Sequence, residues 1–85
     1  MKYMTIWSIR PENMQAVIKR FKEADPKVPG VKVTRFHEMG TGRGFTLTES
    51  DDPVAVAKFA LAWSDLVEQE TVAVVDDAQV AEALK

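Results

Sequence analysis

The sequence contains no cysteine and only one histidine, His37, among its 85 residues. Without cysteine the chain has no disulfide, no thiolate ligand for zinc and no thiol nucleophile. This composition fits a reducing compartment, so we expect a cytoplasmic protein. Structural zinc needs four nitrogen or sulfur ligands, and a single histidine is too few. We therefore expect neither a metal nor a cofactor.

Clustered positive charge and long apolar runs are also missing. Eleven Lys and Arg residues stand against thirteen Asp and Glu residues, and the net charge of −2 argues against nucleic acid as a partner. No run approaches the roughly 20 apolar residues of a membrane span, so we expect no membrane partner. Residues 1–7 lack the apolar core of a signal peptide. A chain of this length makes one domain, residues 1–85, with a thin core that a partner often helps to cover.

What the sequence does contain is a regular succession of hydropathy patterns. Four segments are rich in alternating, β-branched or aromatic residues, and they are predicted strands: residues 3–9, 31–39, 44–49 and 71–75. Helices are predicted to begin at Pro11 and Pro53, because proline suits a first helical turn, and Asp52 is the expected N-cap of the second. Pro26 ends the first helix, and the second is expected to end within residues 64–67.

The end of the chain has its own helix signal. Asp76 and Gln79 have the spacing of a capping box, which predicts a short helix through Leu84. The element order is therefore β-α-β-β-α-β-α. Right-handed crossovers turn that order into an α+β, ferredoxin-like sandwich, with a four-stranded antiparallel sheet covered on one face by two helices. The first and third strands should be central.

The glycine-rich turn between the second and third strands decides which side chains share a face. An even-length turn over residues 40–43 places Phe36, Phe45 and Leu47 on one face; the other face then carries Val31, Val33, Arg35, His37, Thr46 and Thr48. An odd-length turn would group Arg35 and His37 with Phe45 and Leu47. Unpaired polar groups under helices cost several kcal/mol, so we favour the even turn, although the sequence does not fix the register.

The face away from the helices is predicted to be unusually apolar. We expect it to carry Tyr3, Trp7, Ile9, Val31, Val33, Arg35 and His37. A monomer rarely exposes such a patch, so a second copy should cover it and form a homodimer through the open sheet face. The polar residues Arg35, His37, Thr46 and Thr48 would then line a cavity between the sheet and the partner, which is the make-up of a small-molecule site.

Each candidate residue also has a structural interpretation. His37 could act as the catalytic general base or ligand anchor, or it could be a strand histidine bonded to a backbone or carboxylate partner. Arg35 could bind an anionic ligand group or pair with Glu49. Tyr3 and Trp7 could form the aromatic wall of the site or plain dimer core, and Thr46 and Thr48 complete the ligand-binding set. Trp63 fits a buried helical stripe, and Arg43 fits a solvent-facing turn.

Other chemistries find little support. The glycines of residues 40–44 lead into a strand, whereas a phosphate loop leads into a helix. No serine lies in a nucleophile elbow. Glu49 and Asp51 could bind a hard cation only unspecifically.

Several short runs resemble a known superfamily. They are Arg35-Phe36-His37-Glu38, Gly42-Arg43-Gly44-Phe45, Glu49-Ser50-Asp51-Asp52, Trp63-Ser64-Asp65-Leu66 and Val74-Val75-Asp76-Asp77. With the βαββαβ order, they resemble a family of small prokaryotic domains of unknown function within the dimeric α+β barrel superfamily. The resemblance implies a dimer of ferredoxin-like subunits. Relatives include cofactor-free oxygenases, isomerases, haem-degrading enzymes, chlorite-dismutase-like proteins and stress-response proteins, so fold alone does not choose an activity.

Three functions remain open at this point. The first is binding of a small organic molecule, with a cofactor-free oxygenase or isomerase as the enzymatic version. The second is a non-catalytic dimerisation or interaction module. The third is an RNA-binding ferredoxin-like domain whose aromatic side chains stack on bases, against which the acidic balance argues.

Overall fold

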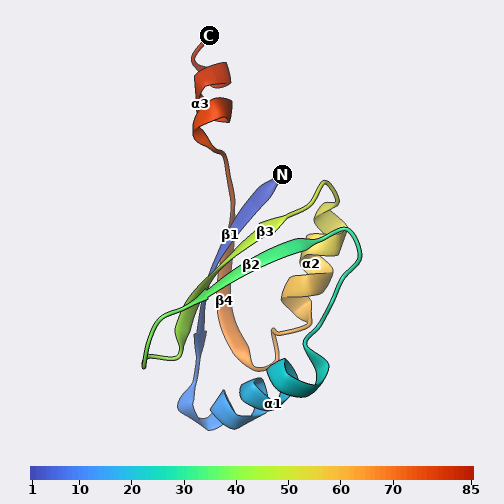
Figure 1. Cartoon of the computed structure of the whole chain (residues 1–85), viewed down its shortest axis with the longest axis vertical. Helices are drawn as coiled ribbons and strands as arrows, with labels where there is room; N and C mark the ends of the chain where they lie inside the picture. The colour runs from blue at the N-terminus through green and yellow to red at the C-terminus, as the bar shows by residue number, and fades with distance from the viewer.

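The computed structural model describes residues 1–85, which form a single antiparallel sheet with two helices on one side and a third helix extending beyond it (Figure 1). The elements in chain order are β1 (Lys2–Ile9), the 3₁₀ helix η1 (Pro11–Asn13), α1 (Met14–Ala24), β2 (Lys32–His37), β3 (Arg43–Glu49), α2 (Pro53–Leu61), β4 (Val67–Val74) and α3 (Asp77–Ala83). No helix in the chain combines the length and the apolar character needed to cross a bilayer.

The sheet has the strand order β2-β3-β1-β4, and every neighbouring pair is antiparallel. The predicted ferredoxin-like α+β topology is therefore confirmed, with β1 and β3 at the centre. β4 is longer than expected, because it pairs along the whole of β1, from Ile9 opposite Val67 to Lys2 opposite Val74. Pairing with a central strand extends the element past the Val- and Thr-rich segment that the sequence marked.

Both helical segments begin at the prolines where the sequence predicted their start. Pro11 opens a 3₁₀ turn that leads into α1, and Pro53 stands at the start of α2. The Asp52 carboxylate caps α2 by accepting a hydrogen bond from the Val54 backbone N–H at 2.9 Å. α2 ends at Leu61, earlier than predicted.

The hairpin register agrees with the even-length turn. Phe36 lies opposite Phe45, and Arg35 lies opposite Thr46. The Glu38 backbone N–H donates to the Arg43 carbonyl at 2.8 Å and closes a four-residue loop. Gly40 and Gly42 have φ values of 79° and 72°, a region that glycine enters without steric cost.

The prediction of which face the helices cover is wrong. Trp7, Arg35 and His37 lie on the side of the sheet that α1 and α2 cover, and side chains of both helices share one cavity with them. The cross-strand pairs place Tyr3, Ile9, Val33, Thr46 and Thr48 on this same side; Val31 precedes β2. The error came from using polarity to choose the covered face, although Thr46 there accepts a hydrogen bond from Trp7 and Arg35 pairs with Asp25, the residue that follows α1.

The open face is apolar nevertheless, with other residues. Its most exposed large side chains are Ile6, Phe36 and Val72, which are 45%, 60% and 50% exposed. The pairing places further apolar residues on the same face, namely Met4, Phe45, Leu47 and Val74. Glu68 and Glu70 share this face along the β4 edge.

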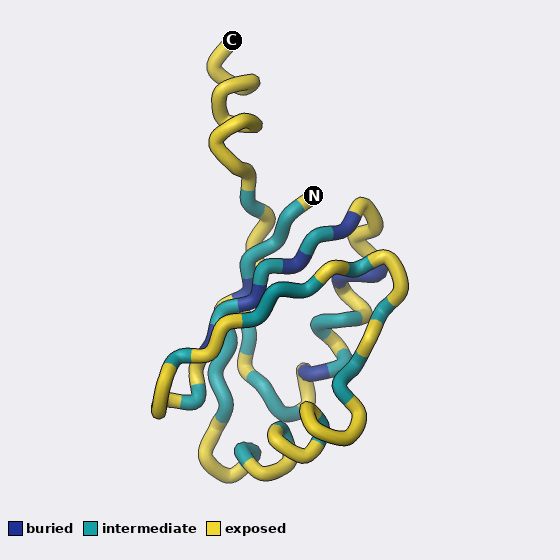
Figure 2. The backbone as a smooth tube through the Cα atoms, in the orientation of Figure 1, coloured by how far each residue is buried: buried dark blue, intermediate teal, exposed yellow.

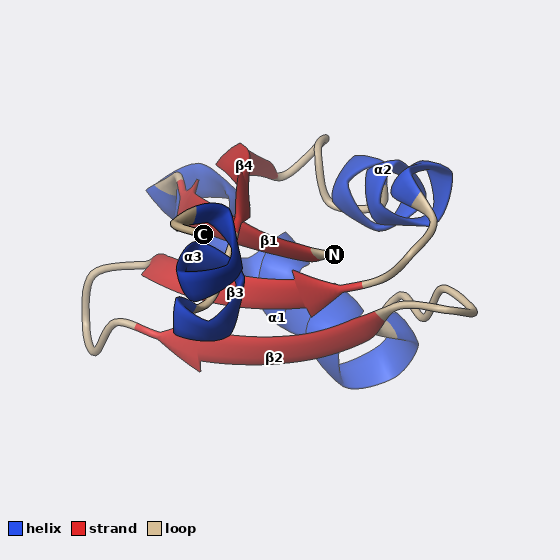
Figure 3. Cartoon of the chain, turned by 90° about the horizontal axis from the view of Figure 1, so that it is seen from above, coloured by secondary structure: helices blue, strands red, loops and turns tan.

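The two layers stand apart, so little of the chain is buried. Only eight of the 85 residues are buried, and none of them lies in α1 (Figure 2). The apolar members of that core are Ala55, Val56 and Trp63. In the view turned by 90°, α2 lies to the side of the strands and α1 lies behind them as a separate helix (Figure 3). The side chains of the sheet and of both helices enclose a cavity between the two layers.

Candidate functional site

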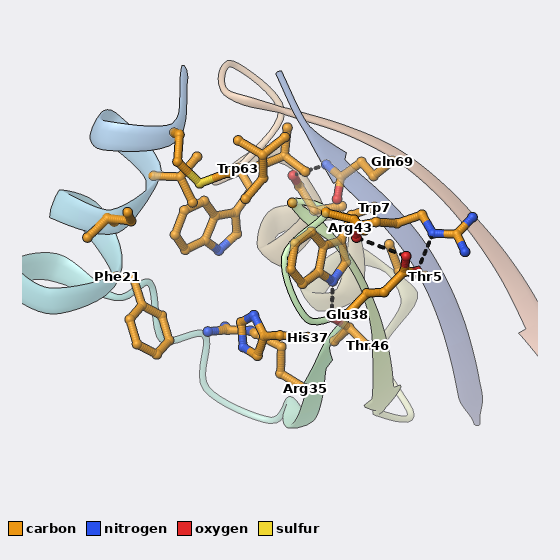
Figure 4. A pocket seen from close by; sticks show the side chains of 18 of the residues that line it. Thr5, Trp7, Phe21, Arg35, His37, Glu38, Arg43, Thr46, Trp63 and Gln69 are labelled. Atoms are coloured by element: carbon orange, nitrogen blue, oxygen red, sulfur yellow. Dashed lines mark hydrogen bonds and ion pairs between the residues drawn. The ribbon is translucent and has the colours of Figure 1, made fainter. Parts of the chain in front are cut away.

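The hollow between the layers is a cavity of about 730 Å³ (Figure 4). All four strands, both covering helices and the β2–β3 loop contribute side chains to its wall. From the sheet come Thr5, Trp7, Ile9, Arg35, His37, Thr46, Thr48, Val67, Gln69 and Thr71; from the helices and the segment that follows α2 come Met14, Val17, Ile18, Phe21, Val56, Phe59, Ala60 and Trp63. The wall is apolar on the helix side and carries its polar groups on the sheet side.

The structure brings five of the six predicted site residues into this one cavity. Trp7, Arg35, His37, Thr46 and Thr48 all line it, whereas Tyr3 lies on the same face but outside the wall. The cavity lies between the sheet and the chain's own helices, so the predicted position between sheet and partner subunit is corrected.

Trp7 forms the floor of the cavity and does not offer its indole N–H to a ligand. That N–H donates to the Thr46 hydroxyl oxygen at 2.9 Å, and Thr46 is 4% exposed. The hydrogen bond fixes the ring orientation across the sheet. Trp7 is therefore held as a flat apolar wall.

Gly44 makes this arrangement possible, although the sequence pattern marked it only as a turn residue. It lies opposite Trp7 in the β1–β3 pairing, and the six-membered ring of Trp7 occupies the space where a β-carbon of residue 44 would be. An aromatic side chain covering a strand glycine shields the backbone that the glycine leaves bare. A glycine directly opposite an aromatic residue was the available signal.

His37 faces the cavity from the edge strand β2. Its ring meets the Trp7 ring edge-on, with centroids 5.4 Å apart, and the Phe21 ring of α1 in the same way at 6.2 Å. Neither ring nitrogen is hydrogen-bonded within the chain, and neither is a buried unsatisfied atom. The alternative of a strand histidine bonded to a backbone or carboxylate group therefore does not apply, and both nitrogens are accessible to a ligand.

Arg35 lies beside His37 and is held by the helix layer. Its guanidinium carbon is 5.4 Å from the Phe21 ring centroid and 5.9 Å from that of Trp63. Its Nη2 donates to the Asp25 carboxylate over 3.4 Å, so the expected alternative pair with Glu49 does not form. A guanidinium has five N–H donors, and this long contact uses one of them. The others are available to an anionic group.

The β2–β3 loop closes one end of the cavity. The Gly42 carbonyl accepts a hydrogen bond from the Ile9 backbone N–H at 2.8 Å, which ties the loop to the end of β1. Glu38 accepts two hydrogen bonds, from Nε of Arg43 at the start of β3 at 2.7 Å and from the hydroxyl of the loop residue Thr41 at 2.9 Å. These two bonds hold the pKa of Glu38 below its usual value. Arg43 is therefore paired with Glu38 at the edge of the cavity.

The helix side is fixed by a second paired arginine that sequence reasoning missed. Arg20 binds both oxygens of Asp65, each at 2.8 Å, and donates to the Ala62 carbonyl at 2.9 Å. Its guanidinium also lies 5.4 Å from the Trp63 ring centroid. The hydrogen bonds from Arg20 lower the pKa of Asp65. This contact joins α1 to the segment after α2 and fixes Trp63 in the cavity wall.

The arrangement suits binding more readily than metal chemistry. No three His, Asp or Glu side chains gather in the way a metal site requires. The cavity instead combines apolar aromatic walls with two polar side chains that still have free hydrogen-bonding groups, Arg35 and His37, which lie side by side on β2. That pairing can orient the polar end of a ligand whose remainder is apolar.

These features define a small α+β domain of ferredoxin-like topology with a ligand-sized hollow between its layers. The whole chain, residues 1–85, matches the family described as a domain of unknown function (DUF3303), and the chain belongs to that family. A search of curated proteins gave no match. Among solved structures, the chain is similar to a de novo designed protein, Foldit4, with 17% identity and a TM-score of 0.45, covering 87% of this chain and 96% of the designed one. The resemblance to a small domain of unknown function is confirmed.

Proposed function

We propose that the chain is a small-molecule-binding subunit whose cavity takes a largely apolar organic molecule with one acidic group. The observation that carries the proposal is the cavity itself, about 730 Å³ within an 85-residue chain. Small-molecule sites span roughly 300–1,000 Å³. The aromatic rings of Trp7, Phe21 and Trp63 would bury the apolar part, and the acidic group would lie at Arg35 and His37.

An empty cavity lowers the stability of the folded chain. The enclosed part of an apolar cavity costs about 24 cal/mol per Å³ when it is left empty, because its lining side chains lose packing contacts. Water fills such a space only where polar groups can bond to it, and the helix side offers few. An apolar ligand relieves the cost directly, since it restores contacts to the walls.

The same site would serve a cofactor-free oxygenase or isomerase. His37 has both ring nitrogens unbonded at the cavity wall, so it can accept or give a proton when the occupant carries a labile one. Arg35 would hold the charge that such a transfer leaves on the ligand.

Two fluorescent probes test the binding site. 1-Anilinonaphthalene-8-sulfonate has an apolar aromatic body and one anionic group, whereas N-phenyl-1-naphthylamine has a similar body without charge. We expect Arg35→Gln to weaken binding of the sulfonate by about tenfold and leave the neutral probe unchanged, because only the sulfonate uses the guanidinium. Lys58→Gln on the exposed side of α2 removes the same charge outside the cavity and should change neither affinity. Equal loss of both probes in Arg35→Gln, or no loss, would contradict the assignment.

The second function is homodimerisation through the open sheet face, and a specific observation favours it. Ile6, Phe36 and Val72 make that face apolar and nothing in the chain covers it. Phe36→Lys should convert a dimer into monomers in sedimentation equilibrium. Met39→Lys is the matched control, because Met39 is 94% exposed and lies in the hairpin loop. Wild-type protein that sediments as single chains at all concentrations would rule out the dimer.

A further inference from the structure

The C-terminal helix α3 is formed but has no packing partner in its own chain. It extends away from the body, and every one of its residues is exposed (Figures 1 and 2). Its start is specified by a complete capping box, in which Asp76 accepts from the Gln79 backbone N–H at 2.9 Å and Gln79 accepts from the Asp76 backbone N–H at 3.0 Å. A seven-residue helix is not stable alone in water, so these signals indicate a helix that packs on something else.

The link to β4 keeps α3 off its own sheet. Only Val75 and Asp76 separate the end of β4 from the start of α3. The Asp76 carboxylate also pairs with Lys2 Nζ at 3.0 Å, which links the start of α3 to the beginning of β1. α3 therefore continues beyond the sheet instead of turning back over it.

α3 carries an apolar stripe. Val80 and Leu84 are four residues apart and so lie on one helix face, and they are 43% and 82% exposed. Ala78 and Glu82 lie on the opposite face. The stripe is what a helix presents to a packing surface.

The amount of exposed surface indicates a second copy as the partner. A folded monomer of 9.5 kDa should expose about 5,050 Å². This chain exposes 6063 Å², and its radius of gyration is 14.2 Å where about 12 Å is expected for 85 residues. The excess is about 1,000 Å² per chain, part of which belongs to the walls of the cavity, so two chains have at most about 2,000 Å² to bury, which reaches the size of a homodimer interface.

We infer that α3 is an exchanged arm: in the dimer, Val80 and Leu84 of each chain pack on the partner's open sheet face beside Ile6, Phe36 and Val72. A two-fold axis makes the exchange reciprocal, so each chain gives one arm and receives one. This arrangement rests on the proposed dimer, to which it adds α3 as a further part of the interface.

The test begins with the full chain and the dimer dissociation constant from analytical ultracentrifugation. Val80→Ser/Leu84→Ser removes the stripe and should raise the dissociation constant by about 100-fold or more, because four aliphatic side chains leave the interface per dimer. Ala78→Ser/Glu82→Ser introduces the same number of serines on the opposite face and should leave it within about threefold.

A second measurement locates the arm. Since the chain has no cysteine, Lys85→Cys accepts a single nitroxide label next to the stripe. Mixed dimers of labelled chains and isotope-enriched wild-type chains should show broadened amide signals at Ile6, Phe36 and Val72 of the enriched chain. A dimer without such broadening, whose affinity the double serine variant leaves unchanged, would overturn the exchanged arm and leave the dimer standing. Single chains at every concentration would overturn both.

Discussion

Replacing Gly44 with alanine places a methyl group where the Trp7 ring lies, and this substitution tests how the cavity floor is built. The backbone at Gly44 does not need glycine, because its φ lies outside the left-handed region. Only the indole obstructs the new atom. Trp7 must move off the strand, and its hydrogen bond to Thr46 must break.

The expected loss follows from three effects. Overpacking costs about 1–3 kcal/mol, and a lost hydrogen bond to a buried hydroxyl costs about 1 kcal/mol. Alanine regains about 0.5–1 kcal/mol over glycine in a strand. We therefore expect Gly44→Ala to lower the free energy of unfolding by about 2 kcal/mol. In a Trp7→Leu background the same substitution should change it by less than about 1 kcal/mol, because the ring is gone.

The free energy of unfolding of four proteins is needed: wild type, Gly44→Ala, Trp7→Leu and the double variant. Urea unfolding followed by circular dichroism at one fixed protein concentration measures it for each of them. Binding of N-phenyl-1-naphthylamine provides a second readout, because a displaced Trp7 ring occupies part of the cavity and should weaken it. Equal effects of Gly44→Ala with and without Trp7 would show that the ring does not lie against residue 44, and the described cavity floor would be refuted.

Three further substitutions probe the cavity and its supports. Ala60→Phe should abolish binding of N-phenyl-1-naphthylamine without lowering stability, because Ala60 lines the cavity, whereas Ala57→Phe on the exposed side of α2 should bind normally in the same titration. Asp52→Ala should lower the free energy of unfolding by about 0.5–2 kcal/mol because the helix cap is lost, whereas Asp52→Asn should keep most of the wild-type stability because asparagine can also cap the helix. Urea unfolding of both variants measures the difference. Arg20 lowers the pKa of Asp65, so the stabilisation is present above the unfolded-state pKa near 3.8 and is lost as pH falls through the lower folded-state value. Asp65→Asn should therefore be less stable than wild type at pH 7, and the difference should shrink below about pH 4 in acid titrations of unfolding; a constant difference would contradict the pairing.

Local signals in the sequence were sufficient for the topology. The prolines at positions 11 and 53 and the cap at Asp52 act over a few residues, and the structure follows them. Gly40 and Gly42 allow the tight loop that sets Phe36 opposite Phe45, but the sequence leaves two registers open, and the even turn is favoured there by a polarity argument that the structure does not follow. The helix starts and the tight loop depend on nearest neighbours along the chain.

The covered face could not be predicted in this way. Alternation along a strand divides side chains between two faces, but both faces of this sheet are apolar enough to be buried. The polarity of Arg35 predicts that it avoids the helix side, yet Asp25, ten residues away in sequence, pairs with it there. A partner brought in by tertiary structure reverses the cost on which the prediction depended.

The sequence predicted several of the residues that line the site, but it did not predict on which side of the sheet the site lies. The grouping of Trp7, Arg35, His37 and Thr46 follows from the register, so these residues reach one cavity whichever face is covered. The hollow itself depends on how far the helix layer stands from the sheet, and no periodicity in the sequence encodes that separation.

A ligand bound between the sheet and the helices, as proposed, should change the surroundings of both tryptophan side chains, and the NMR signals of the two indole N–H groups test this binding site most directly. Trp7 and Trp63 are the only tryptophans in the chain, and both line the cavity from opposite layers. Titration of isotope-enriched protein with 1-anilinonaphthalene-8-sulfonate should shift both indole signals with one common dissociation constant. Indole signals that stay in place while the amides of Ile6, Phe36 and Val72 shift would put the probe on the open face and contradict the account.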